Sequence, residues 1–306
     1  VETLMAKRIG FVGIGTIGKP MALNIRKGGY ELAVFDLDQS AVADLIAAGA
    51  TGKGSPAAVA EASDIVITMV PDAPDVEKAA LGAGGIIEGL APGALYIDMS
   101  TVDPATTRKV GAAMAARHIR MVDAPVGRTV DNAYAGTLSI MVGGEAADVE
   151  EAMPVLKCMG TDITHCGPLG NGHAVKLVNN YISGGILALL SEGLTMGVKS
   201  GLELETILEV VGATFATSGI MTKMLPARAF HGDFSPGFKT TLSHKDIRLG
   251  LGLATAAGLD APVGHGVYET LSRTIAAGYG DDDFTSMLRV NEAKAGVEVR
   301  LKGQGD

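Results

Sequence analysis

The first apolar run and the glycine-rich turn after it constrain the fold of this 306-residue chain most strongly. Residues 8–13 have a strand pattern, residues 13–18 read Gly-Ile-Gly-Thr-Ile-Gly, and a helical pattern follows. In this context the first glycine permits a tight turn, the second admits a pyrophosphate and the third lets the helix pack closely. The helix N-terminus adds unpaired N–H groups and partial positive charge. We therefore predict a dinucleotide-binding loop comprising Gly13, Gly15, Thr16, Ile17 and Gly18.

An acidic residue follows the second strand pattern. Residues 32–35 are apolar and are followed by Asp36, which lies 23 residues after Gly13. A carboxylate at this point can accept hydrogen bonds from the ribose hydroxyls of the cofactor, and it repels a 2′-phosphate. We therefore expect NAD rather than NADP. The alternative is that Asp36 only caps the next helix.

Strand and helix patterns alternate through the first half of the chain. Further strand patterns lie at 64–70, 95–99, 121–124 and 138–142, and helical patterns at 38–48, 56–62, 74–81 and 104–117. This order predicts an α/β fold, a Rossmann doubly wound and mostly parallel sheet with ligands at the carboxyl ends of its strands. Val70 ends one of these strand patterns and Thr101 lies just after another, and we expect both to contact the cofactor.

Strand patterns are absent after about residue 169. The helical patterns there cover 174–200, 204–212, 221–230, 243–257, 263–277 and 286–297. We predict an NAD-binding domain at 1–168 and an all-α helical domain at 169–306, which begins with a long interdomain helix.

Composition excludes several partners. The net charge of −9 argues against a nucleic-acid-binding face. The two cysteines and six histidines form no zinc-ligand pattern, so we expect no metal. No apolar run approaches the roughly 18 residues of a membrane span, and no signal-peptide pattern is seen. We expect a cytoplasmic protein without a membrane partner.

Polar residues share one face of the long helix. Lys176, Asn180 and Ser183 are spaced i, i+4 and i+7, with Asn179 at the margin of that face. On an otherwise apolar helix this grouping indicates a site, although a solvated polar stripe is the alternative.

Six ordered motifs carry a family resemblance over almost the whole chain. They are the loop 13–18 with Pro20-Met21-Ala22, Asp98–Thr101, Asp123–Val126, Gly136–Gly144, Gly170–Asn180, and Asp233–Phe238 with Lys245-Asp246. Together they resemble the β-hydroxyacid dehydrogenase family. The resemblance implies a helical domain used in dimerisation, hence a homodimer or homotetramer, and catalysis by Lys176. It also implies that Lys245 closes over the cofactor near the nicotinamide, with a surface lysine as the alternative.

The chemistry of carbonyl reduction supports the assignment of Lys176. Hydride transfer leaves an alkoxide, which needs a proton or a cation nearby. Lys176 can donate that proton, and Asn180, one turn later, can hold the substrate hydroxyl or fix the lysine. A Schiff-base lysine is the less favoured alternative. A catalytically idle dinucleotide-binding scaffold is the alternative from another class.

One departure from the family pattern bears on the substrate. Most members have Ser-Gly-Gly after Asp-x-Pro-Val, whereas this chain has Gly127-Arg128-Thr129. The variant resembles the branch that reduces 3-sulfolactaldehyde, in which the matching residues hold a sulfonate. The resemblance implies an anion clamp formed by Arg128, Asn179, Asn180 and Ser183. Because arginine also binds carboxylates, succinic semialdehyde and tartronate semialdehyde are alternative substrates, and Arg128 pairing with a local acid such as Asp131 is the structural alternative.

Overall fold

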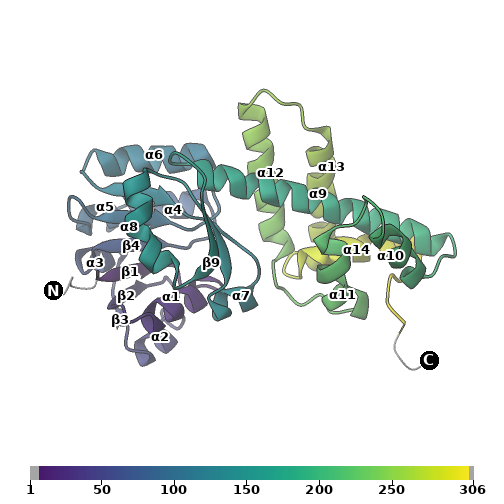
Figure 1. The fold of residues 1–306 in the computed structure, drawn as a ribbon, viewed down its shortest axis with the longest axis horizontal. Helices are drawn as coiled ribbons and strands as arrows, with labels where there is room; N and C mark the ends of the chain where they lie inside the picture. The colour runs from purple at the N-terminus through teal and green to yellow at the C-terminus, as the bar shows by residue number, and fades with distance from the viewer. Residues whose placement is uncertain (1–6, 303–306) are drawn as a thin grey trace. The chain divides into compact units, whose positions relative to one another are not determined.

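The computed structural model describes residues 7–302 (Figure 1). The chain divides into two units, one ending at Lys176 and one starting at Leu177. Helix α9 (Asn171–Lys199) begins in the first unit and continues into the second. The predicted domain boundary, between 168 and 169, falls just ahead of this helix.

The first unit contains the predicted parallel sheet, with six strands in the order β3-β2-β1-β4-β5-β6. The strands are β1 (Ile9–Val12), β2 (Leu32–Phe35), β3 (Thr51–Gly52), β4 (Ile65–Thr68), β5 (Leu95–Asp98) and β6 (Arg120–Asp123). Strands β2 and β3 lie on one side of β1, and β4, β5 and β6 lie on the other, so the order of the strands reverses between β1 and β4. In such a sheet ligands bind outside the carboxyl ends of the strands at the reversal.

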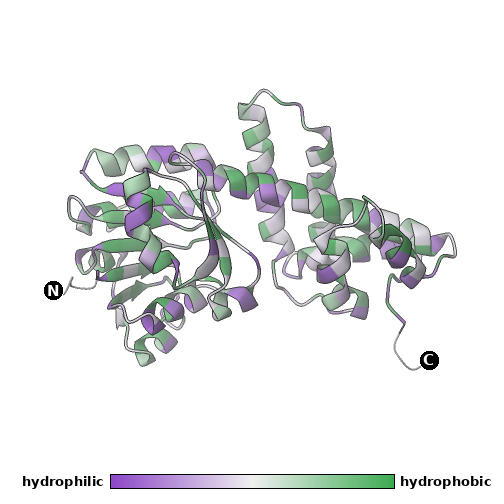
Figure 2. Ribbon diagram, in the orientation of Figure 1, coloured by the Kyte–Doolittle hydropathy of each residue, from purple (hydrophilic) through white to green (hydrophobic). Residues whose placement is uncertain are grey.

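Helices cover both faces of this sheet because alternate strand residues point to opposite sides. Phe11 packs into the core with helices α1 (Gly18–Lys27), α2 (Ala43–Ala47) and α8 (Ala146–Leu156). The next residue, Val12, packs into the core on the opposite face, with α3 (Pro56–Glu61), α4 (Ala73–Leu81), α5 (Ile86–Gly89) and α6 (Pro104–Ala115). The central strands β1, β2, β4 and β5 are accordingly hydrophobic over most of their length (Figure 2). The doubly wound prediction is confirmed.

The prediction for residues 138–142 needs a correction. They form β8 (Leu138–Val142), which lies not in the six-stranded sheet but in a separate sheet of order β7-β8-β9. Strand β7 (Val126–Gly127) is antiparallel to β8, and β9 (Gly160–His165) is parallel to it. The sequence patterns missed β9 because most of its residues are polar and exposed. They also missed β3 and β7, which have two residues each, the short helices α5 and α7 (Val130–Ala135), and the longer helix α8.

The second unit is helical, as predicted. After α9 it contains α10 (Leu204–Gly212), η1 (Ile220–Met224), α11 (Leu225–Ala227), η2 (Ala229–His231), α12 (Thr240–Ala256), α13 (Pro262–Thr274), η3 (Ile275–Tyr279), η4 (Phe284–Ser286) and α14 (Met287–Ala295). The single helix predicted at 221–230 is wrong: the segment is π-helical, then α-helical, then 3-10. Pro226 lies within it, and a proline cannot donate the backbone hydrogen bond that a continuous helix needs.

Helix α9 is long and, on average, apolar. Within residues 7–302 it is the one helix whose length and composition would allow it to cross a membrane. The core helix of a soluble protein can pass the same test. Polar residues interrupt the apolar residues of α9, so the helix contains no continuous apolar run of about 18 residues.

Candidate active site

The glycine loop between β1 and α1 has the geometry of a phosphate cradle. Gly13 has φ +97°, a conformation that favours glycine. A Cβ on Gly18 would collide with the Gly13 carbonyl oxygen, so only glycine allows helix α1 to start there. A Cβ on Gly15 would meet no atom within 4 Å, which leaves room for a ligand against the backbone. No side chain caps α1, so the residues present fit the pyrophosphate of a dinucleotide.

Asp36 is tied to this loop rather than to the next helix. Its Oδ2 accepts a hydrogen bond from the Ile14 amide at 2.5 Å, and its Oδ1 accepts one from the Asp38 amide at 2.8 Å. Helix α2 begins at Ala43, with Val42 at its N-cap, so Asp36 does not cap it. The carboxylate therefore stands beside the glycine loop, at the end of β2.

The loops after β4 and β5 lie next to the glycine loop in sheet order, because β4 is flanked by β1 and β5. The Val70 amide donates to Ser100 Oγ at 3.0 Å, and the Ser100 amide donates to Asp98 Oδ1 at 3.1 Å. Ser100 thus fixes the segments that carry Val70 and Thr101. Sequence reasoning did not single out Ser100, although it follows the same strand as Thr101.

Arg128 lies in the first unit with an unusual backbone. Its φ is +81°, in the left-handed region that favours glycine. Its Nη1 donates to the Thr137 carbonyl at 2.6 Å, and its Nη2 is 2.5 Å from Asp162 Oδ2. The partner acid is Asp162 and not Asp131, which was the acid suggested by the sequence. The hydrogen bond from the Thr161 hydroxyl, together with the pairing with Arg128, holds the pKa of the Asp162 carboxyl below its ordinary value.

Helix α9 carries the predicted polar face, and in the second unit that face reaches a buried carboxylate. Asn180 Nδ2 donates to Asp246 Oδ2 at 2.5 Å, and Asn180 Oδ1 accepts from Asn179 Nδ2 at 3.0 Å. Lys245 Nζ is 3.2 Å from Asp246 Oδ1, an ion contact rather than a well-directed hydrogen bond. The structure thus brings Asn180 and Lys245 to Asp246, and Asn179 lies beside Asn180.

Asp246 was not among the predicted site residues. It is buried, and a carboxylate there needs partners of opposite charge or hydrogen-bond donors. Its position next to Lys245 in the sequence was the available signal. Lys176 lies one turn before Asn180 on the same helix, and Ser183 lies about one turn after it.

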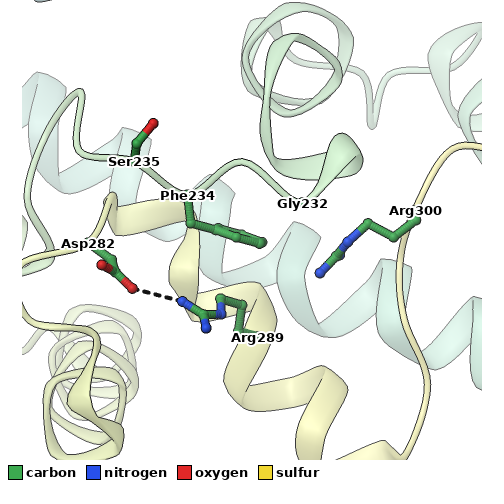
Figure 3. Close-up of a pocket in the computed structure, with 6 residues that line it drawn as sticks. All are labelled: Gly232, Phe234, Ser235, Asp282, Arg289 and Arg300. Atoms are coloured by element: carbon green, nitrogen blue, oxygen red, sulfur yellow. Dashed lines mark hydrogen bonds and ion pairs between the residues drawn. The ribbon is translucent and has the colours of Figure 1, made fainter.

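A separate pocket of about 340 Å³ in the second unit contains no predicted site residue (Figure 3). Its lining residues are Gly232, Phe234, Ser235, Asp282, Arg289 and Arg300. Arg289 donates to Asp282 at 2.7 Å, and Arg300 pairs with Glu292. Because each guanidinium already has a carboxylate partner, the pocket has little excess positive charge for an anion. Among residues 7–302, no cluster of three or more His, Cys, Asp or Glu side chains is arranged to hold a metal ion.

The fold and the cradle define a dinucleotide-dependent oxidoreductase in which a Rossmann unit is followed by a helical unit. Residues 8–167 match the family model described as the NAD-binding domain of 6-phosphogluconate dehydrogenase. Residues 170–291 match the model described as NAD-binding of NADP-dependent 3-hydroxyisobutyrate dehydrogenase.

Known relatives match along nearly the whole chain. The 3-sulfolactaldehyde reductase of Escherichia coli is 38% identical over 96% of this chain and 99% of its own. The 2-(hydroxymethyl)glutarate dehydrogenase of Eubacterium barkeri is 39% identical over 95% of this chain and 97% of its own. The solved structure of Mycobacterium tuberculosis 3-hydroxyisobutyrate dehydrogenase with L-serine has a TM-score of 0.87 and 29% identity, covering 94% of this chain and 99% of its own. The chain belongs to the β-hydroxyacid dehydrogenase family and is an NAD(P)-dependent oxidoreductase of the 3-hydroxyisobutyrate dehydrogenase-like group.

Proposed function

We propose that this enzyme uses NADH to reduce a short aldehyde that carries a terminal anionic group, and that the preferred substrate is 3-sulfolactaldehyde, reduced to 2,3-dihydroxypropane-1-sulfonate. The observation that carries this proposal is the backbone of Arg128. A non-glycine residue at φ +81° costs on the order of 1–3 kcal/mol. Strain of this kind is concentrated at functional sites, so we infer that the Arg128 side chain is kept for recognition of an anion.

The proposed proton donor is Lys176. When bound, the nicotinamide cofactor supplies the hydride. The Lys176 ammonium then gives its proton to the oxygen of the former carbonyl. Asn180 Nδ2 has two hydrogens, of which one goes to Asp246. We assign the other to the substrate oxygen, so Asp246 orients the amide that orients the substrate.

Arg128, Asn179, Asn180 and Ser183 are proposed to hold the anionic group. A guanidinium offers several N–H donors in a planar fork, which suits either a sulfonate or a carboxylate. In the substrate-free enzyme that fork is engaged by Asp162 and the Thr137 carbonyl. Both contacts are exposed, so exchanging them for a substrate anion requires no buried charge to be left unpaired.

NAD is the proposed cofactor because of Asp36. The carboxylate would accept hydrogen bonds from the ribose hydroxyls and would oppose a 2′-phosphate. Lys245 is proposed to contact the cofactor near the nicotinamide.

The substrate proposal is tested by steady-state kinetics with NADH. We expect kcat/KM for 3-sulfolactaldehyde to exceed the values for succinic semialdehyde and tartronate semialdehyde. A preference for either carboxylate would reject the sulfonate and retain the anion clamp. Activity that survives Lys176→Ala on every accepted aldehyde would reject the assignment of the proton donor.

We also propose a cytoplasmic homodimer or homotetramer. On α9, Ile182, Leu189 and Met196 recur every seven residues and are 55%, 66% and 69% exposed. A seven-residue spacing places them on one helical face, and a second copy of the chain would cover such a face. Light scattering after size-exclusion chromatography should give a multiple of the chain mass, and Leu189→Glu should reduce it. A monomeric wild type would reject this proposal.

A further inference from the structure

His173 is a buried polar side chain at the start of the helix that carries Lys176. It lies three residues before Lys176 in the sequence, and its side chain has no exposed surface. It faces groups from α6, from the ends of β5 and β6, and from the segment after β5. Burial of an imidazole in this way requires each ring nitrogen to have a partner.

The partners define which ring nitrogen carries the proton. Nε2 is 2.9 Å from the Ser100 carbonyl oxygen, which can only accept, so Nε2–H is the donor. Nδ1 is 2.7 Å from Thr107 Oγ1, and in a neutral ring it accepts the hydroxyl hydrogen. The two nearest titratable groups are Asp123, 3.6 Å from Nδ1, and Asp98, 4.0 Å from Nε2.

Ser100 connects this ring to the predicted cofactor loops. Its carbonyl accepts from His173, its amide donates to Asp98, and its hydroxyl accepts from the Val70 amide. The next residue is Thr101. One hydrogen bond therefore joins the segment that carries Thr101 to the first turn of α9.

Asp123 fixes the same turn through the backbone. Its Oδ1 accepts from the Gly170 amide at 2.6 Å, and its Oδ2 accepts from the His173 amide at 2.7 Å. These contacts satisfy N–H groups at the helix start that have no partner within the helix, and they place negative charge at the positive end of its dipole. Asp123 therefore anchors the helix, whereas the His173 ring links it to the Ser100 segment.

We propose that His173 is a positioning residue that couples cofactor binding at the Ser100–Thr101 segment to the placement of Lys176. The inference rests on the proposed function, in which Lys176 donates the proton and Thr101 contacts the cofactor. Neither ring nitrogen needs to touch substrate or cofactor for this role. What the role requires is a hydrogen-bond donor at the position of Nε2, and the Thr107 hydroxyl holds the imidazole ring that presents this donor.

Substitution of His173 by Gln and by Asn distinguishes a hydrogen-bonding role of the side chain from a role in packing alone. In His173→Gln the side-chain amide can reach the Ser100 carbonyl, whereas in His173→Asn it reaches only the position of Nδ1. We expect the Gln variant to keep kcat within about threefold of wild type. We expect the Asn variant to lose kcat about 10- to 100-fold, the effect of a misplacement on the order of 1 Å, with KM for NADH changed much less. Equal kcat in the two variants would overturn the proposal.

A measurement independent of turnover tests the coupling itself. We expect NADH to slow amide hydrogen exchange in residues 171–177 as well as in the glycine loop 13–18. In His173→Asn the loop should still be protected, but the protection of residues 171–177 should disappear. His173→Gln should behave like wild type. Protection of residues 171–177 that persists in the Asn variant would overturn the proposal.

A milder pair of variants covers the case in which the Asn variant does not fold. Thr107→Val removes the hydroxyl partner of Nδ1 with little change of shape, and Thr107→Ser keeps it. We expect the Val variant, but not the Ser variant, to lose part of the NADH-dependent protection of residues 171–177 and part of kcat. Unchanged values in both would overturn the proposal.

The proton-donor role of Lys176 and the positioning role of His173 can be rejected by different results. If Lys176→Ala keeps its activity, the proton donor is wrong, and the exchange experiment still reports whether His173 couples cofactor to helix. If Lys176→Ala is inactive and His173→Asn matches wild type in kcat and in exchange, only the positioning role is wrong. If NADH protects neither segment in wild type, the proposed NAD site and this inference are both rejected.

Discussion

Substitution of Arg128 separates backbone strain from anion recognition. Arg128→Ala keeps a Cβ at φ +81°, whereas Arg128→Gly removes it. Both variants lose the exposed pair with Asp162, so the effect of that pair cancels in the comparison. The left-handed conformation costs an L-residue about 1–2 kcal/mol, and glycine loses roughly 0.5–1 kcal/mol through the greater freedom of its unfolded chain. From the midpoints of the two ranges, the Gly variant should be more stable than the Ala variant by about 0.75 kcal/mol.

The function of the two variants should change in parallel. A hydrogen bond to a charged group contributes about 1.5–3 kcal/mol, so we expect kcat/KM for the preferred anionic aldehyde to fall roughly 10- to 100-fold in both. Arg128→Lys should recover only part of the loss, because an ammonium lacks the planar fork. A neutral short aldehyde provides the control, and its kcat/KM should change little.

The measurements are chemical denaturation at neutral pH and steady-state kinetics with NADH. Asp162→Asn is the matched control, since it removes the ion pair without altering the backbone of Arg128. It should leave activity near wild type. Equal stability of the Ala and Gly variants would refute the strain argument. Unchanged kcat/KM in both would mean that Arg128 serves only Asp162 and the Thr137 carbonyl.

Three further predictions address the cofactor, pH and helix packing. Asp36→Asn keeps one acceptor oxygen but removes the negative charge that would repel the 2′-phosphate of NADPH. The ratio of kcat/KM for NADPH to that for NADH should therefore rise roughly tenfold. A wild-type enzyme that already prefers NADPH would contradict this prediction. The Arg120 hydrogen bonds lower the pKa of Glu151 from 4.5 to about 2. The ionised Glu151 carboxylate therefore contributes stability that is fully present above pH 4.5 and is lost as the pH falls towards 2. The melting temperature of wild type should exceed that of Glu151→Gln by less as the pH falls through this window, and a constant difference would be inconsistent with this linkage. A Cβ on Gly172 would collide with the Met141 carbonyl oxygen, so Gly172→Ala should destabilise the protein by about 1–3 kcal/mol. In the same helix, a Cβ on Gly185 would meet no atom within 4 Å, so Gly185→Ala should be neutral or slightly stabilising. Equal stability of the two variants would argue against close packing at Gly172.

Local patterns were sufficient for five of the six strands of the parallel sheet. These five contain short apolar runs separated by helical periodicity, and a parallel connection requires such crossovers. The edge strand β3 has only two residues, both exposed, and no local pattern indicates it. Strand β9 escaped this reasoning because a mostly polar, exposed strand has no apolar run to reveal it. The helical pattern at 221–230 predicts one helix, but Pro226 lies within the segment and the structure has three short helical pieces there.

The site was predictable to a different degree in its two parts. The glycine loop and Asp36 could be predicted from their spacing, because each glycine meets a local need of the backbone: a tight turn, room for a ligand or close packing of the helix. Asp246, Ser100 and His173 were missed. Their importance comes from burial and from partners 66, 30 and 73 residues away in the chain, respectively. No periodicity signals a polar side chain that is buried because distant polar groups meet it.

The sequence by itself determined the fold class, the dinucleotide loop and the run of polar residues on α9, because these depend on neighbours within one strand or a few helical turns. Only the tertiary structure decided that Arg128 adopts a left-handed backbone and pairs with Asp162. It also decided that His173 bonds to Ser100 and that Asn180 bonds to Asp246. These features depend on which strand ends and helices come together. That is fixed by packing of the whole unit rather than by any local pattern.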